Sequence, residues 1–188
     1  MRAPLTPSQT VGPFFGVGLP YEGGEQVVPP GTPGAIRLEG QVLDGNGDPV
    51  PDALIEIWQP DDRGRYRRVT DSDATRGKSR DPSTGFGRCR TDAEGAFSFM
   101  TVKPGATSSP DGRMQAPHLN VTVFARGLLR HLVTRMYFPD EREANATDPV
   151  LNLVEPSRRH TLIAKACGGL LHFDVRLQGE GETVFFAI

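Results

Sequence analysis

Short runs of alternating apolar residues, each ended by glycine, proline or an acidic turn, constrain the fold of this 188-residue chain most. Its 22 glycines and 17 prolines interrupt the sequence too often for long helices. Alternation with a period of two places every second side chain on one face of a strand, so these runs indicate half-buried strands. Many short strands with almost no helical period predict an all-β fold, a single antiparallel β-sandwich with little helix.

Turn sequences separate the expected strands. Residues 44–47 and 92–95 are acidic and glycine-rich turns, and residues 60–85 and 104–117 are longer loops. One short helix is expected at residues 140–146, with Asp140 as its N-terminal cap. The tail, residues 182–188, is strand-like. The first expected strand begins at Ala35. The other expected strands cover residues 53–59, 86–91, 96–102, 118–126, 130–138, 161–167 and 170–177.

The first 34 residues differ from the rest because they are rich in glycine and proline and lack a sustained period. We interpret residues 1–34 as an extended N-terminal arm and loop, and residues 35–188 as the sandwich domain. An arm of this kind cannot bury itself, so we expect it to pack on its own domain or on a neighbouring subunit.

Composition excludes several classes of protein. The formal net charge is −2, which argues against a general nucleic-acid-binding protein. No apolar run reaches the roughly 18 residues that a membrane helix needs, and the N-terminus lacks the apolar core of a signal peptide. The two cysteines form neither a disulfide framework nor a zinc motif. We therefore expect a cytoplasmic protein with neither a membrane nor a nucleic acid as partner.

Two places in the sequence are candidate functional sites. His118 and Asn120 lie on the same face of an expected strand, but asparagine is a poor transition-metal ligand beside imidazole, so the pattern favours a structural histidine. Arg126 ends the same strand beside a turn. The pattern alone favours a solvated arginine there, and the functional alternative is an anion site for a carboxylate or phenolate. A Ser-His-Asp hydrolase has no supporting motif, because the sequence contains no GxSxG turn.

A series of motifs occurs in a fixed order along the chain: residues 6–15, 40–47, 55–59, 87–92, 101–105, 117–120 and 124–127, followed by residues 149–153, 161–165 and 178–186. In this order they resemble the intradiol ring-cleavage dioxygenases. The similarity covers nearly the whole chain and is weakest over residues 19–34 and 67–84. The C-terminal stretches resemble most closely the iron-free chain of a two-chain member of that family.

In the family, two tyrosines and two histidines bind a ferric ion, and this chain departs from that pattern. Tyr66 matches a non-ligand position, and no tyrosine lies between it and His118. Thr107 falls where the second tyrosine is expected, and Asn120 replaces the second histidine. The resemblance therefore implies a degenerate metal site at Thr107, His118 and Asn120, with no metal bound by this chain.

The resemblance also implies a partner. It predicts a homologous beta subunit that binds Fe(III), in a hetero-oligomer that cleaves protocatechuate with O₂ to 3-carboxy-cis,cis-muconate. This chain is expected to contribute Thr10, Gly12, Pro13 and Arg126 to the partner's substrate pocket and no catalytic residue of its own. Glycine lets the backbone approach a ligand closely, and proline stiffens the arm.

Two alternatives remain from the sequence. One is a catalytic intradiol dioxygenase with an unusual metal site, acting on protocatechuate, catechol or hydroxyquinol. The missing tyrosines argue against it. The other is a non-enzymatic β-sandwich binding module, since one fold serves many functions.

Overall fold

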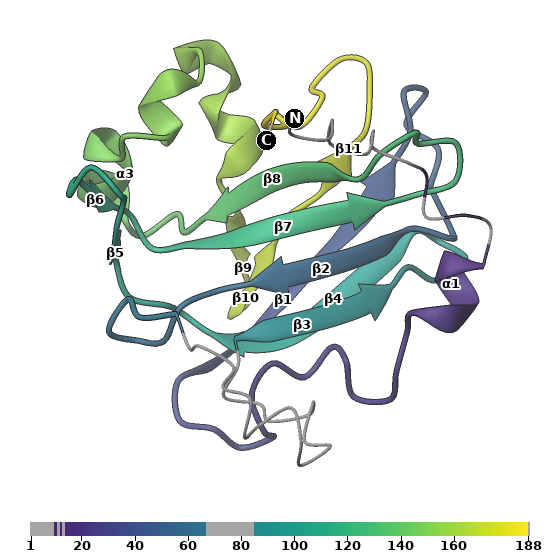
Figure 1. The fold of residues 1–188 in the computed structure, drawn as a ribbon, viewed down its shortest axis with the longest axis horizontal. Coiled ribbons are helices and arrows are strands. Elements are labelled where there is room, and N and C mark those ends of the chain that lie inside the picture. Colours follow the sequence, from purple (N-terminus) through teal and green to yellow (C-terminus); the bar gives the residue numbers. More distant parts are fainter. Residues whose placement is uncertain (1–9, 11, 13, 67–84, 188) are drawn as a thin grey trace, which may run out of the picture.

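Two β-sheets face each other in the computed structural model, which describes residues 10, 12, 14–66 and 85–187 (Figure 1). The small hairpin of β5 and β6 lies at one end of the sandwich, and the one-turn helix α1 lies at the other. The helices are α1 (Phe15–Gly18), α3 (Arg142–Thr147) and the 3₁₀ helices η2 (Leu151–Leu153) and η3 (Pro156–Leu162). The strands are β1 (Ala35–Leu43), β2 (Leu54–Trp58), β3 (Phe86–Arg90), β4 (Ala96–Val102), β5 (Thr107–Ser108), β6 (Met114–Gln115), β7 (His118–Phe124), β8 (Leu132–Tyr137), β9 (Lys165–Cys167), β10 (Leu170–His172) and β11 (Val175–Arg176).

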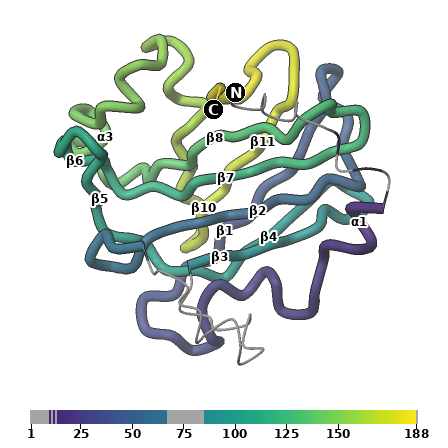
Figure 2. Tube along the Cα trace, viewed as in Figure 1, coloured from purple at the N-terminus to yellow at the C-terminus, as the bar shows by residue number. Residues whose placement is uncertain are grey.

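The first sheet is built around β1. Its antiparallel partner β4 runs along one edge, from the Ala35–Val102 pair to the Gln41–Ala96 pair. The short strands β10 and β11 run parallel to β1 along its other edge, and Figure 2 shows these C-terminal segments beside the N-terminal strand. The all-β sandwich is thus confirmed, but this sheet is mixed. Parallel pairing needs a long crossover, which the chain between β1 and β10 supplies.

The second sheet has the order β3-β2-β7-β8 and is antiparallel throughout. The register places Trp58 opposite Asn120 and Asn120 opposite Arg135, so these three residues form a row across the sheet. His118 lies opposite Tyr137 in the same way. The predicted hairpin around Gly127 is confirmed by this pairing of β7 with β8.

Alternation along the strands divides inner from outer side chains. The inner residues of β7, including Val121 and Val123, are almost completely buried. They pack with Leu38 and Phe99 of the first sheet in the main core. Burial of each such side chain contributes about 1.5–3 kcal/mol, so this core is the main source of stability. A second cluster lies under the C-terminal helices and consists of Ala116, Tyr137, Leu151, Val154 and Leu162.

Three local predictions were wrong. Helix α3 begins at Arg142, and the Asp140 carboxylate accepts a hydrogen bond from Lys103 Nζ at 2.7 Å instead of capping it. Thr161 belongs to η3, because Pro156 starts a 3₁₀ helix where a strand was expected. The tail forms no strand among its described residues, although Phe186 N–H donates to the Val133 carbonyl at 2.8 Å.

The second half of the N-terminal arm packs on its own domain. Val27 is buried, and its N–H donates to the Met100 carbonyl of β4 at 2.9 Å. Arg88 of β3 donates through Nη1 to the Leu19 carbonyl at 2.8 Å. The side chains of Phe14 and Val17, nearer the N-terminus, are 78% and 79% exposed. The expectation that the arm packs on a partner therefore concerns the residues before Leu19.

Candidate functional site

The predicted degenerate metal site lies on the outer face of the second sheet. His118 is 2% exposed, and its Nδ1 lies 2.7 Å from the Ala116 carbonyl oxygen. A carbonyl can only accept, so Nδ1 carries the proton and Nε2 is the nitrogen left for other partners. Burial, followed by the positive charge of Arg135, lowers the pKa of His118 to about 4. His118 is therefore a neutral, buried imidazole at neutral pH.

Asn120 is engaged by two aromatic residues. Its Nδ2 donates to the Tyr66 hydroxyl at 2.8 Å and to the Trp58 carbonyl at 3.3 Å. The Tyr66 ring packs on the Trp58 indole, with ring centroids 4.5 Å apart. Burial raises the pKa of Tyr66, so its hydroxyl stays protonated at neutral pH. The amide is thus used to fix a neutral phenol and does not face an open ligand position.

Arg135 connects this face of the sheet to the β5–β6 hairpin. Its Nη1 donates to Gln115 Oε1 at 2.6 Å and lies 3.5 Å from the Tyr137 hydroxyl oxygen. Gln115 is paired with Thr107 across the hairpin, and both residues are buried. Arg135 is therefore linked to each of the three predicted positions: it lies opposite Asn120 in the sheet, its charge acts on His118, and it binds the hairpin partner of Thr107.

A buried aspartate holds the residues next to His118 in place. Asp148 is fully buried, and its Oδ1 accepts the Tyr137 hydroxyl at 3.0 Å. The same oxygen accepts the N–H groups of Val150 and Leu151, and Oδ2 accepts the N–H of Ala116. The Tyr137 ring lies 5.7 Å from the His118 ring, centroid to centroid. Asp148 thereby fixes the residues next to His118.

The donor set at this pocket does not fit a ferric ion. It offers one neutral imidazole, a carboxamide already bound to a phenol, and a threonine hydroxyl on the hairpin. Amide and hydroxyl oxygens suit hard cations of low charge and do not replace two tyrosinates. The guanidinium of Arg135 adds a permanent positive charge among these groups. The described residues around His118 therefore do not fit an iron site.

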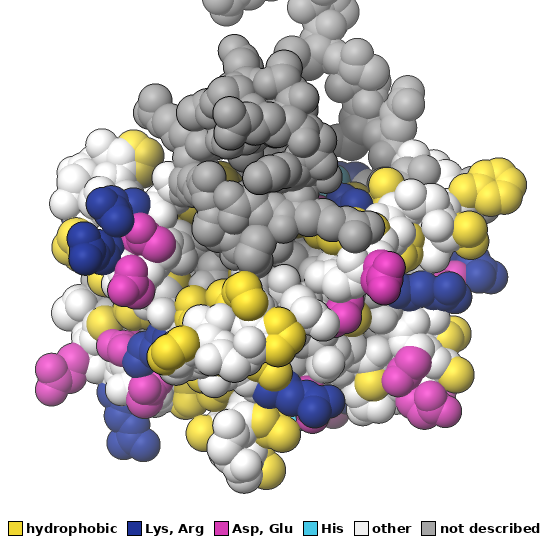
Figure 3. All heavy atoms as spheres, turned by 90° about the horizontal axis from the view of Figure 1, so that it is seen from below, with side chains coloured by type: hydrophobic (Ala, Val, Ile, Leu, Met, Phe, Trp, Pro, Cys, Tyr) yellow, Lys and Arg dark blue, Asp and Glu magenta, His cyan; other side chains and the backbone are white. Residues whose placement is uncertain are grey.

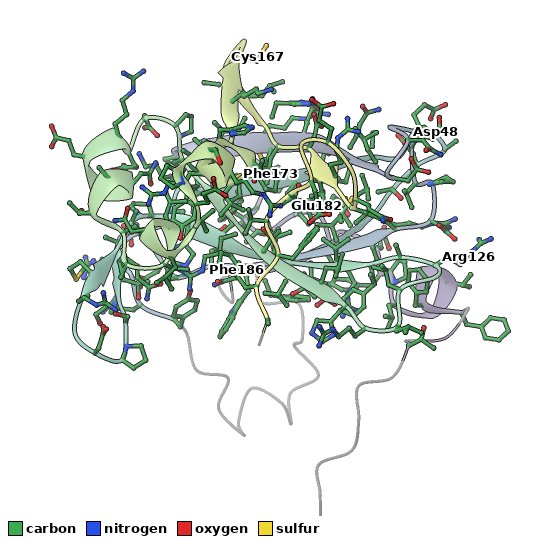
Figure 4. All side chains as sticks on the ribbon, turned by 90° about the horizontal axis from the view of Figure 1, so that it is seen from above. Asp48, Arg126, Cys167, Phe173, Glu182 and Phe186 are labelled. Atoms are coloured by element: carbon green, nitrogen blue, oxygen red, sulfur yellow. The ribbon has the colours of Figure 1, made fainter. Side chains whose placement is uncertain are left out.

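The predicted substrate-contacting residues lie elsewhere. Arg126 follows the far end of β7, and its Nη2 forms an ion pair with Asp52 Oδ2 at 2.5 Å. Its side chain is 82% exposed and points outward at the end of the sandwich near α1 (Figure 4). The six steps of β7 from His118 to Phe124 span about 20 Å at the usual strand rise. Arg126 therefore does not belong to the pocket around His118.

The arm residues are placed at the start of the described chain. Thr10 is exposed, and the N–H of Gly12 donates to its Oγ1 at 3.5 Å. Gly12 has φ = 82°, a left-handed conformation that favours glycine. α1, which follows them, lies at the same end of the sandwich as Arg126 (Figures 1 and 4). Pro13 lies outside the described residues.

A large cavity of about 800 Å³ lies between the arm and the segment that follows β2. Three of its charged lining residues are already paired, because Arg65 binds Asp61 at 3.0 Å and Lys103 binds Asp140 at 2.7 Å. Residues 67–84, which lie outside the described residues, follow directly after its lining residue Tyr66. No ligand is assigned to this cavity.

The surface has no segregated charge on the face drawn in Figure 3, where acidic and basic side chains are interspersed. This agrees with the net charge of −2. Within the described residues no helix combines the length and the apolar character that crossing a membrane requires.

The sequence did not identify Arg135, Tyr137 or Asp148 as site residues. A signal existed for Arg135, which interrupts an apolar run at an outward-facing position of β8. None existed for Asp148, because its partners are distant in sequence and become neighbours only on folding.

The two-sheet sandwich, with His118 and Asn120 on the outer face of β7 beside the β5–β6 hairpin, has the fold of an intradiol dioxygenase. A family model described as "Dioxygenase" matches residues 11–179. The chain belongs to the intradiol ring-cleavage dioxygenase family, as predicted.

Individual relatives refine this similarity. The protocatechuate 3,4-dioxygenase alpha chain of Burkholderia cepacia is 46% identical over 200 residues, covering 97% of both chains. The beta chain of the same enzyme from that organism is 34% identical over 195 residues, covering 96% of this chain and 79% of that one. Among solved structures, the dioxygenase domain of a dioxygenase carbohydrate-binding fusion from Streptomyces sp. SirexAA-E has a TM-score of 0.60. It is 26% identical, with 82% of this chain and 87% of that one covered.

Proposed function

We propose that this chain is the alpha subunit of a protocatechuate 3,4-dioxygenase. It assembles with a homologous beta subunit that binds Fe(III), and the complex opens the ring of protocatechuate with O₂, giving 3-carboxy-cis,cis-muconate. The observation that carries the proposal is the donor set around His118, where an amide and a guanidinium stand among the positions that would bind iron. The greater identity to an alpha chain, 46% against 34% for a beta chain, supports the same assignment.

The separation along β7 supports a role in the partner's pocket. Arg126 and the pocket around His118 are at opposite ends of this strand, so Arg126 cannot serve a substrate bound near His118. If Arg126 binds substrate, that substrate lies in a pocket completed by another subunit. Its ion pair with Asp52 is an exposed one, worth about 0–1 kcal/mol, so an anionic substrate can compete for the guanidinium at small cost.

The arm completes the proposed contribution. Thr10, Gly12 and Pro13 line the partner's pocket together with Arg126. The left-handed conformation of Gly12 leaves its backbone unobstructed, and a Cβ built there would meet nothing within 4 Å. The exposed Phe14 and Val17 beside these residues provide apolar surface that a subunit interface would bury.

The assembly is tested by co-expression of this chain with a beta chain from the same organism. We expect a stable complex that contains iron, has the red-brown colour of tyrosinate–iron charge transfer, and consumes O₂ with protocatechuate. This chain purified alone is expected to be colourless and free of iron. Iron and colour in this chain alone would refute the assignment of the metal to the partner.

The role of Arg126 is tested by Arg126→Ala in that complex. A charged hydrogen bond contributes about 1.5–3 kcal/mol, so we expect kcat/KM for protocatechuate to fall by about 10- to 100-fold, with iron content unchanged. Arg130→Ala is the matched control, because Arg130 is an exposed arginine in the same β7–β8 connection. Equal kinetics for the two variants would remove Arg126 from the substrate pocket.

We also infer that the complex works in the cytoplasm. Cys89 and Cys167 are both free thiols, as expected in a reducing compartment.

A further inference from the structure

The group of residues around His118 contains a cation of its own. Arg135 lies opposite Asn120 in the sheet, its charge acts on His118, and its side chain binds Gln115, the hairpin partner of Thr107. Its hydrogen bond to Gln115 holds it at the hairpin. The positive charge of Arg135 lowers the pKa of His118, in the same direction as burial. It also lowers the pKa of Tyr66, where burial acts in the opposite direction and has the larger effect.

We propose that the Arg135 guanidinium takes the place of the metal ion in this pocket, bridging the sheet to the hairpin and excluding metal cations by charge. The inference deepens the proposal that the partner holds the iron, but it concerns this chain's residues alone.

The geometry supports this role in two ways. First, Arg135 lies directly opposite Asn120 in the β7–β8 register, so its side chain leaves the sheet next to the altered ligand position. Second, no carboxylate among the described residues forms an ion pair with Arg135, whose side chain contacts Gln115 and Tyr137. The buried Asp148 carboxylate is separated from Arg135 by the Tyr137 hydroxyl, which contacts both. A divalent or trivalent ion beside His118 and Asn120 would therefore meet the guanidinium's positive charge, which no directly bound carboxylate offsets.

The substitution of Asn120 is consistent with this arrangement. An imidazole beside a guanidinium would be disfavoured in its protonated form and could not donate two hydrogen bonds in its neutral form. A carboxamide donates to both Tyr66 and Trp58 and adds no charge. The Asn120 amide can therefore lie beside the Arg135 guanidinium without electrostatic repulsion.

The test restores one ligand and then removes the charge. Asn120→His in the full-length chain places two imidazoles at i and i+2 on the same face of β7, beside the Tyr66 hydroxyl. Co²⁺ is the probe, because imidazole coordination changes its visible absorption and permits titration. We expect no site-specific Co²⁺ binding by Asn120→His alone, and binding at least about tenfold tighter when Arg135→Gln is added.

Three controls separate charge from other effects. Arg135→Lys in the Asn120→His background keeps the cation and is expected to keep Co²⁺ out. Arg130→Gln in the same background removes an exposed arginine outside the pocket and is expected to change nothing. Circular dichroism checks the fold of each variant, and Arg135→Met replaces Arg135→Gln if the glutamine variant does not fold.

Two results would overturn the inference. Equal Co²⁺ affinity with and without Arg135 would show that its charge does not exclude the metal. Absence of binding in every folded variant would show that a feature other than Arg135 bars it. Neither result depends on turnover of protocatechuate, so failure here and failure of the proposed function are distinguishable.

Discussion

Asp148 offers the sharpest test of how this structure is held together. Its carboxylate is fully buried and accepts four hydrogen bonds: from the N–H groups of Ala116, Val150 and Leu151 and from the Tyr137 hydroxyl. Asp148→Ala leaves these donors without an acceptor. Three of them belong to residues that are themselves buried, and each unsatisfied buried donor costs about 1–3 kcal/mol.

We therefore expect Asp148→Ala to lower the free energy of unfolding by about 3–5 kcal/mol, a large part of the total for an ordinary domain. Asp148→Asn keeps Oδ1 and its three bonds but places an amide donor against the Ala116 N–H, so a smaller loss of about 1–3 kcal/mol is expected. Urea unfolding followed by circular dichroism measures both.

Asp140→Ala is the matched control for the loss of an aspartate carboxylate. Asp140 is 68% exposed and is bound by Lys103, so its removal should cost about 0–1 kcal/mol. The reasoning is refuted if Asp148→Ala and Asp140→Ala unfold at the same urea concentration.

Two further predictions concern buried positions. The pKa of His118 is lowered from 6.5 to about 4 in the folded chain. Between these pH values the unfolded chain binds a proton at His118 and the folded chain does not. The free energy of unfolding should therefore fall by about 3 kcal/mol as the pH drops from 6.5 to 4. Urea unfolding of wild type and His118→Gln across this range should show a smaller pH dependence in the variant; equal slopes would contradict the assignment. Gly40→Ala should cost at least about 2 kcal/mol, because its Cβ would overlap the Phe173 carbonyl oxygen. Gly16→Ala, with nothing within 4 Å of its Cβ, should change the unfolding temperature little, and equal effects would show that the close approach relaxes freely.

Local alternation was sufficient to predict most of the strands, because strands such as β4, and β1 from Leu38 onward, bury every second side chain. The same reasoning failed where the partner of a segment is distant in sequence. The parallel pairing of β10 and β11 with β1 depends on the crossover through the second sheet, which no local pattern records. The stretch at Thr161 has strand-like residues, but Pro156 initiates a 3₁₀ helix over the second cluster.

Only part of the site was predictable, because local periodicity relates residues of one strand but not residues of different segments. His118 and Asn120 are two residues apart on one strand, so their shared face followed from periodicity alone. Thr107, placed only through family resemblance, reaches the pocket because it pairs with Gln115, which in turn binds Arg135. A polar network of this kind joins residues from four segments, and each link exists only after the sheet and hairpin have docked.

The loss of ligands and the gain of a cation are best understood together. A metal ion binds several side chains at once and so joins segments that would otherwise separate. Replacing ligands without replacing that bridge would leave buried polar groups unsatisfied, at a cost of about 1–3 kcal/mol each. Here Arg135 joins β8 to the hairpin, Asn120 joins β7 to Tyr66, and Asp148 joins β8 to the C-terminal helices. The residues around His118 are therefore held together by these hydrogen bonds without a metal ion. Under the proposed function it is the opposite end of β7, with Arg126 and the arm, that serves a neighbouring subunit.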